Sequence, residues 1–351
     1  MIVSNIEAPD IEPYSGPKAI TVEIHKLRQL SKIIRALGTG GWIFRGHESN
    51  DWHLSSSLER EFSELSTRSS SAKANKASST NCSGTRFGDS DEMYAIDSFR
   101  RYSQSLLKPL NTEVEWLAAM QHYGAPTRLV DFSRSLYVAL YFAFQNRHEK
   151  STRAIYAIRF KDLIHNNTIR GDLISVLVNE YSSKYRHSPE SAEEYREFIE
   201  TEYYKNQLAL QTTLIDLASQ CIRKELTQDI DGVIPVHVPG ANDRLTAQSG
   251  LFLLPRTFNS FEDNLSASLG VAKKEVFEPS CTIADDAILA HGVTDKLRRA
   301  SYLKLVFDEI DLSNSAIWNM LDQANVSAMN LFPGLEGIAK SIRYGEPLFS
   351  M

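Results

Sequence analysis

The stretch GWIFRGHESNDWHLSSSLERE, residues 41–61, places an arginine directly after an apolar, aromatic run and directly before a glycine. Residues 42–44 predict a strand that heads into the core. Arg45 then needs an anion, a carbonyl group or water as partner, because an unpaired buried charge is very costly. In the simplest interpretation Arg45 closes the strand at the surface and Gly46 makes the turn. In the alternative, Arg45 points into a cleft and binds a phosphate or carboxylate with two hydrogen bonds.

The size and charge of the chain restrict its class. With 351 residues, of which 42% are hydrophobic, it can bury a large core, and we treat residues 1–351 as a single domain. The formal net charge of -6 argues against a basic surface that binds nucleic acid through counterion release alone.

Cysteine usage and hydropathy indicate the compartment. Cys82, Cys221 and Cys281 are odd in number and widely spaced, which predicts neither a disulfide framework nor a CxxC metal site. We therefore expect a reducing, cytoplasmic location. Residues 1–20 lack a basic region followed by an apolar run, and no stretch approaches the roughly 20 apolar residues that span a bilayer. We expect no association with a membrane.

Two segments differ from their surroundings. Residues 64–91 are rich in Ser, Ala, Thr and Lys and nearly lack large apolar residues, which predicts a mobile insertion, since such a segment cannot repay its ordering entropy. Residues 171–228 carry mostly helical patterns and form a second, helical insertion within the domain.

The remaining pattern predicts the fold class. We expect helices over 21–37, 92–107, 113–124 and 135–146 and from 311 to the last element at 331–344, and strands at 42–44, 125–132, 153–160, 231–239, 250–256 and 302–307. Strands and helices mix without regular βαβ alternation. This favours an α+β fold with a mixed, largely antiparallel sheet and surrounding helices. Glycine-rich phosphate loops, zinc-type histidine pairs and a G-x-S-x-G elbow are missing from the sequence.

A second stretch, MQHYGAPTRLVDFSRSLYVALYFAF at residues 120–144, concentrates polar side chains between two apolar helices. They are His122, Tyr123, Thr127, Arg128, Asp131, Ser133 and Ser135. In a structural interpretation, Asp131 or Ser133 caps the following helix and Arg128 pairs with Asp131. In a functional interpretation, the cluster marks the mouth of a pocket.

A third stretch, NDRLTAQSGLFLLP at residues 242–255, carries Gln248 just before an apolar strand. Its amide either contacts a ribose hydroxyl or satisfies backbone groups. His237 alternates with Val236 and Val238, so we interpret it as an ordinary strand histidine.

Together these stretches resemble the FRG domain family, which is named for an F/Y-R-G motif present here at residues 44–46. The resemblance continues through DWHLSSSLER (51–60), QHYGAPTRLVDFSRSLYVALYFA (121–143), RLTAQSGLFLLP (244–255) and LFPGLEGIAKSI (331–342). FRG domains are known mainly from prokaryotic and phage-related proteins.

The order of polar residues is also similar to that of ADP-ribosyltransferases. That family has an arginine on the first strand, a Ser/Thr-x-Ser element before a helix and a polar residue on a later strand, which correspond here to Arg45, Ser133-Arg134-Ser135 and Gln248. The similarity implies an ADP-ribosyltransferase-like core and NAD⁺ as substrate. Arg45 would hold a phosphate or ribose oxygen, and Ser133 and Ser135 would position the nicotinamide ribose.

Further roles follow from the same similarity. His122 or Tyr123 would contact the nicotinamide, and Thr127 and Arg128 would add contacts to the dinucleotide. At the last position this sequence departs from the pattern, because Gln248 stands where a transferase has a glutamate that stabilises the oxocarbenium-like transition state. Asp131 is the alternative source of the carboxylate.

Three functions remain open at this point. The first is ADP-ribosylation of a macromolecular target, protein or nucleic acid, by a toxin or phage-defence effector with an antitoxin or regulatory partner. The second is a module that binds a nucleotide without chemistry, which the uncharged Gln248 favours. The third is an RNA-acting effector with His122 as its acid–base group and Arg128 as its phosphate ligand.

Overall fold

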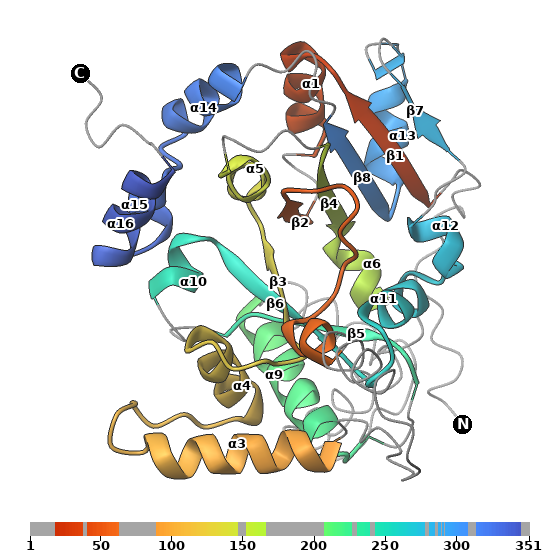
Figure 1. Ribbon diagram of the computed structural model, residues 1–351. Coiled ribbons are helices and arrows are strands. Elements are labelled where there is room, and N and C mark those ends of the chain that lie inside the picture. The colour runs from red at the N-terminus through yellow and green to blue at the C-terminus, as the bar shows by residue number, and fades with distance from the viewer. Residues whose placement is uncertain are drawn as a thin grey trace, which may run out of the picture.

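The computed structural model describes residues 18–37, 41–62, 89–146, 152–165, 207–226, 230–238, 243–277, 281–284, 287–288, 290, 292–307 and 314–344. These residues fold around one mixed sheet of eight strands in the order β5-β6-β3-β2-β4-β8-β1-β7 (Figure 1). The strands are β1 (Ala19–Ile24), β2 (Trp42–His47), β3 (Val130–Ser133), β4 (Arg153–Arg159), β5 (Val233–Val236), β6 (Gly250–Pro255), β7 (Thr282–Ile283) and β8 (Tyr302–Phe307). Among the described strands, β1 pairs in parallel with β7 and β8, and every other pair is antiparallel. The predicted α+β class with a largely antiparallel sheet is confirmed.

Helices cover both faces of this sheet. They are α1 (Leu27–Leu37), α3 (Asp89–Ser103), α4 (Glu113–His122), α5 (Leu136–Phe144), α6 (Phe160–His165), α9 (Gln207–Ile222), α10 (Asp243–Ala247), α11 (Phe261–Leu269), α12 (Lys273–Phe277), α13 (Val293–Arg299), α14 (Asn314–Gln323), α15 (Ala328–Leu331) and α16 (Leu335–Arg343). One buried cluster joins α1, α5, α13 and α14 to strands β1, β2, β4 and β8. A second joins α3, α4 and α9 to β5 and β6, and a third joins α11 to the centre of the sheet.

The sheet parts between β2 and β3. The strands β2 and β4 pair over six residues, whereas β2 and β3 share one pair, Phe44 opposite Ser133. Beyond that pair the two strands diverge, so that β3, β6 and β5 form one side of the opening and β2, β4 and β8 the other (Figure 1). At the opening, a side chain replaces strand pairing for at least one backbone group, because the Asp131 carbonyl accepts a hydrogen bond from Arg45.

Gly46 brings β2 against α5. A Cβ atom at this position would overlap the main-chain carbonyl oxygen of Ala139 and crowd the backbone nitrogen of Ala143. Glycine is therefore required here for packing, because it lets the strand backbone touch the helix backbone. The simplest sequence interpretation, in which Gly46 makes a turn, is wrong, since β2 continues through Gly46 to His47.

Most predicted elements are present, but the helix predicted over residues 21–37 is wrong in its first part. Residues 19–24 form β1, which pairs with β8 over six residues. Alternating burial of Ile20, Val22 and Ile24 is the strand signal that the helical spacing concealed. The helix α1 begins only at Leu27, where the Gln29 side chain accepts hydrogen bonds from the preceding backbone.

Both predicted insertions lie largely outside the described residues. Of the Ser-rich segment 64–91, only residues 89–91 are described, and they begin α3. Of the helical segment 171–228, the described part is 207–226, most of which is α9.

Candidate functional site

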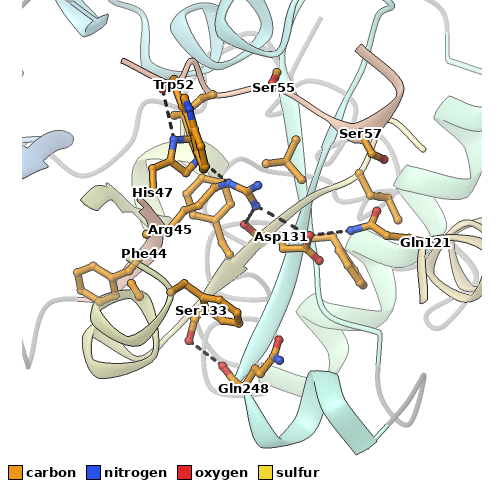
Figure 2. A pocket seen from close by; sticks show the side chains of 18 of the residues that line it. Phe44, Arg45, His47, Trp52, Ser55, Ser57, Gln121, Asp131, Ser133 and Gln248 are labelled. Carbon is orange, nitrogen blue, oxygen red and sulfur yellow. Dashed lines mark hydrogen bonds and ion pairs between the residues drawn. The ribbon is translucent and has the colours of Figure 1, made fainter. Parts of the chain in front are cut away.

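A cleft of about 1080 Å³ occupies the place where β2 and β3 part. It is lined by β2 and the loop after it, the C-terminal end of α4, the start of α5, β3 and α10. Polar side chains from these elements point toward one another across the opening (Figure 2). The size is that of a pocket for a nucleotide-sized ligand.

Arg45 lies at the centre of the cleft. Its Nη1 atom donates a hydrogen bond of 2.7 Å to the main-chain oxygen of Asp131 and lies 3.9 Å from the Asp131 carboxylate. The bond reaches a carbonyl that the diverging strands leave unpaired, and the side chain is 19% exposed. Burial lowers the pKa of Arg45 and the Asp131 charge raises it. An arginine stays protonated under these conditions, so a positive charge faces the cleft.

His47 supports Arg45 from behind. The Nε atom of Arg45 donates to Nε2 of His47 at 3.1 Å, and Nδ1 of His47 lies 3.3 Å from the main-chain oxygen of Trp52. Since Nε2 accepts, the proton must be on Nδ1, which donates to Trp52. Burial, followed by the Arg45 charge, lowers the pKa of His47 to about 3. The imidazole is therefore neutral at physiological pH.

These contacts form a continuous polar chain across the opening. Figure 2 shows it running from Trp52 through His47, Arg45 and Asp131 to Gln121. The amide nitrogen of Gln121, at the end of α4, donates to the Asp131 carboxylate at 2.8 Å. The chain thereby joins β2 to α4 through β3, and it orients the Arg45 guanidinium from two sides.

A second set of bonds fixes the loop after β2. The hydroxyl of Thr127 donates to the amide oxygen of Gln121 at 2.6 Å. The backbone N–H of Thr127 donates to the Ser57 hydroxyl, which in turn donates to the Thr127 carbonyl oxygen. Residues 57–62 are helical, so this turn of helix is tied to the segment before β3.

Ser133 and Gln248 meet on the β3 side of the cleft. The Ser133 hydroxyl donates to the main-chain oxygen of Gln248 at 2.7 Å and accepts from the backbone N–H of Ser135. The amide nitrogen of Gln248 donates to the Leu331 carbonyl oxygen at 3.1 Å. Gln248 is thus held at both its main chain and its side chain.

Acidic groups occupy another part of the cleft wall. Glu262, which is largely buried, accepts from Nδ1 of His53 at 3.1 Å and lies 3.9 Å from Nζ of Lys273. Burial raises the pKa of Glu59, although hydrogen bonds from backbone N–H groups oppose this shift. The cleft therefore combines the Arg45 cation with carboxylates that are partly neutralised by neighbours.

Five of the predicted site residues line the cleft, and four do not. Arg45, His122, Asp131, Ser133 and Gln248 line it. Tyr123, Thr127, Arg128 and Ser135 are not among the lining residues. Tyr123 is exposed outside the cleft, Thr127 is buried in the contact with Gln121, and His122 is an exposed residue at the rim. His237 follows β5, and burial lowers its pKa.

Ser135 caps α5. Its side chain accepts a hydrogen bond from the backbone N–H of Val138. The expectation that Asp131 or Ser133 caps this helix is wrong, because both residues lie within β3 and only Ser135 stands directly before the helix.

Arg128 is buried in the core, next to the C-terminal end of β6. Its Nε and Nη2 atoms contact the two carboxylate oxygens of Glu92 at 3.0 and 2.8 Å, and both side chains are 3% exposed. Nη1 donates to the main-chain oxygens of Pro255 and Arg256. The expected pairing of Arg128 with Asp131 is wrong, because Asp131 is exposed on the cleft and Glu92 on α3 supplies the buried partner.

Sequence reasoning missed several residues of the site, among them Gln121, His47, Trp52 and Glu262. His47 stands two positions after Arg45 on the same strand, and strand alternation was a signal for it. Trp52 lines the cleft and is 53% exposed, a burial state that the sequence does not reveal. Glu262 reaches His53 across 209 residues of chain, and no local pattern predicts this contact.

Among the described residues, His, Cys, Asp and Glu side chains form no group of three or more that would hold a metal ion. Within the same ranges, every helix is too short or too polar to cross a bilayer.

Comparison with protein families matches residues 40–152 to the FRG domain. The chain contains an FRG domain. Its matched range includes Arg45, Asp131 and Ser133 but ends before Gln248 and Glu262, so the cleft is completed by residues outside it. The similar stretches at 244–255 and 331–342 also lie beyond the match. No curated protein and no solved structure matches this chain, so the expected ADP-ribosyltransferase-like core stays a prediction.

Proposed function

We propose that this FRG-domain protein binds NAD⁺ in the cleft between β2 and β3 and transfers its ADP-ribose to a macromolecular target. One observation carries the proposal. Arg45 on β2, Ser133 on β3 and Gln248 in the turn before β6 line one cleft, and β2, β3 and β6 are neighbouring strands. The order along the chain that is similar to transferases is therefore matched by adjacency in space.

The cleft suits a dinucleotide in its charge. Arg45 offers a guanidinium that two hydrogen bonds already orient, and among the described residues Nη2 has no hydrogen-bond partner. A fixed, partly buried cation of this kind favours a pyrophosphate or ribose oxygen. Orientation before binding lowers the entropy that the ligand must lose.

The reaction requires the bond between nicotinamide and C1′ of the ribose to break. Nicotinamide leaves with the bonding electron pair, and a nucleophile of the target attacks C1′ and loses its proton. Asp131 supplies the carboxylate that stabilises the developing positive charge, since it lies in the cleft beside Arg45. Gln248 has no charge and its amide already binds Leu331, so it acts through position and not as an acid.

Labelled NAD⁺ tests the proposal. Purified protein is incubated with cell extract and NAD⁺ that is labelled on the adenylate, and both transfer of label and release of nicotinamide are measured. Wild type transfers label, Arg45→Ala does not, and Arg100→Ala retains activity because Arg100 lies on α3 and pairs with Asp97. Absence of transfer and of nicotinamide release in the wild type rejects the proposal.

Binding without chemistry is the second candidate, and the uncharged, fully engaged Gln248 favours it. In that case NAD⁺ raises the melting temperature and is not consumed. The RNA-acting alternative is less well supported, because its phosphate ligand Arg128 is occupied by the buried Glu92. RNA degradation by the purified protein without NAD⁺ would favour it.

The same proposal covers the biological role as a toxin or phage-defence effector with a regulatory partner. Regulated expression in a bacterial host tests this: wild type stops growth, whereas Arg45→Ala at equal protein level does not. Equal growth of both strains would show that the protein is not toxic to this host, whether or not it transfers ADP-ribose.

A further inference from the structure

Trp52 presents a large aromatic surface to the cleft beside His47. Its side chain lines the cleft and is 53% exposed, whereas Trp42 and Trp116 are at most 5% exposed. The indole packs edge-on to the His47 ring with 6.1 Å between ring centroids. Figure 2 shows the indole edge-on, overlapping the His47 ring in this view, with the Arg45 guanidinium to its lower right.

The backbone of Trp52 is held in place although its side chain is exposed. Its carbonyl oxygen accepts a hydrogen bond from Nδ1 of His47 at 3.3 Å and another from the Tyr156 hydroxyl at 3.1 Å. Two residues later, Leu54 is buried and anchors the loop. Two polar side chains of the sheet thus position a loop residue whose ring remains exposed to solvent. This arrangement is typical of a preorganised binding surface and not of a mobile loop tip.

We propose that Trp52 is a stacking platform for a planar heteroaromatic ring of a nucleotide whose ribose or phosphate oxygens bind Arg45. An indole face gains free energy from stacking on any nucleobase-like ring, because every such ring has a π face. The inference rests on the proposed function only in taking the ligand to be a nucleotide. It does not require that ADP-ribose is transferred.

The assignment differs from the roles expected for His122 and Tyr123. Tyr123 does not line the cleft, and His122 is exposed at its rim and packs edge-on to Tyr123, with 4.9 Å between centroids. Among the described residues, no side-chain hydrogen bond joins His122 or Tyr123 to the polar chain that orients Arg45, whereas the Trp52 carbonyl is the first member of that chain.

Equilibrium binding to three ligands tests the proposal on the purified full chain. AMP carries adenine, nicotinamide mononucleotide carries nicotinamide, and ribose 5-phosphate carries no base. Trp52→Leu removes the aromatic face, and Trp52→Phe keeps one. We expect Trp52→Leu to bind the ligand with the stacked ring about 10- to 100-fold more weakly, and Trp52→Phe to stay within about 5-fold of wild type.

The choice of ligand identifies the stacked ring. If Trp52→Leu loses affinity for AMP alone, the stacked ring is adenine. If it loses affinity for nicotinamide mononucleotide alone, the stacked ring is nicotinamide. Affinity for ribose 5-phosphate is expected to be equal in all three proteins, and their melting temperatures report intact folding. Quenching of Trp52 fluorescence by the same nucleotide, absent in Trp52→Phe, supports stacking directly.

Several results would overturn the inference. They are unchanged affinity of Trp52→Leu for both base-carrying ligands, an equal loss of affinity for ribose 5-phosphate, or no binding of either nucleotide to wild type. If nucleotides bind through Trp52 and nicotinamide is never released from NAD⁺, the transferase proposal fails and the stacking site stands.

Discussion

Arg45 donates from Nε to Nε2 of His47 at 3.1 Å, and the same imidazole donates from Nδ1 to the Trp52 carbonyl. The hydrogen bond that orients the Arg45 guanidinium therefore requires a neutral His47. Protonation of His47 would place two N–H groups and two positive charges face to face.

This relationship predicts that the fold loses stability in mild acid. The pKa of His47 is lowered to about 3 in the folded chain, from about 6.5 in the unfolded chain. Because the unfolded chain binds the proton first, stability is complete above pH 6.5 and falls as pH decreases from 6.5 toward 3. The difference corresponds to at most about 5 kcal/mol, at roughly 1.4 kcal/mol for each tenfold change in proton affinity.

The free energy of unfolding in urea, measured from pH 7 to pH 4 in wild type and His47→Gln, isolates this contribution. His47→Gln is less stable at pH 7 but has the shallower pH dependence, because glutamine does not titrate. The charges of Arg60 and Lys304 also lower the pKa of His47, although less than burial and Arg45 do. Parallel curves for the two proteins would show that His47 does not titrate as proposed.

Gly46→Ala should destabilise the fold by about 3 kcal/mol or more, because its Cβ would overlap the backbone of α5 at Ala139, which cannot move without shifting the helix. Gly250→Ala is the matched control. There the nearest obstacle is the flexible tip of the Leu245 side chain, and we expect a loss of about 1 kcal/mol. Chemical unfolding of both variants measures the difference, and equal losses would refute the backbone contact as the cause.

Arg128→Met should cost about 3–5 kcal/mol, since it leaves the buried Glu92 carboxylate unpaired. Adding Glu92→Met should restore more than half of the loss, although the Pro255 and Arg256 carbonyls still lose their hydrogen bonds from Arg128. NAD⁺ affinity of the double variant should equal that of wild type. A double variant that folds but no longer binds NAD⁺ would mean that Arg128 reaches the ligand after all.

Asp131→Asn should reduce nicotinamide release about 100-fold, if its carboxylate stabilises the transition state as proposed. Stability should change by less than about 1 kcal/mol, because the side chain is 58% exposed and the short Arg45 bond goes to the main-chain oxygen. Asp97→Asn, which removes an exposed acid paired with Arg100, is the control. Full activity in Asp131→Asn together with loss of activity in Gln248→Ala would move catalysis to the Gln248 position.

Local patterns predicted much of the architecture. The apolar runs of α5 and β6 and the alternation in β8 each lie within a single element, where local sequence is sufficient to predict it. Local patterns gave a wrong prediction at residues 19–24, because the short apolar alternation there is continuous with the helical spacing of α1. Pairing with β8 stabilises the strand at these residues, and the sequence does not reveal that pairing. The class of fold and the FRG motif could thus be predicted, but not the strand order.

The sequence by itself determined the class of fold and many of its helices and strands, that Gly46 stands beside a charged residue, and that polar residues gather near positions 45, 131 and 248. Only the tertiary structure decided which of them share the cleft. In the folded chain Arg128 pairs with Glu92, and Ser135 caps α5. His47, Trp52 and Asp131 lie around Arg45. The physical reason is range: hydrophobic periodicity and capping act over a few residues, whereas ion pairs form between whichever groups the packing of distant strands brings within a few ångströms.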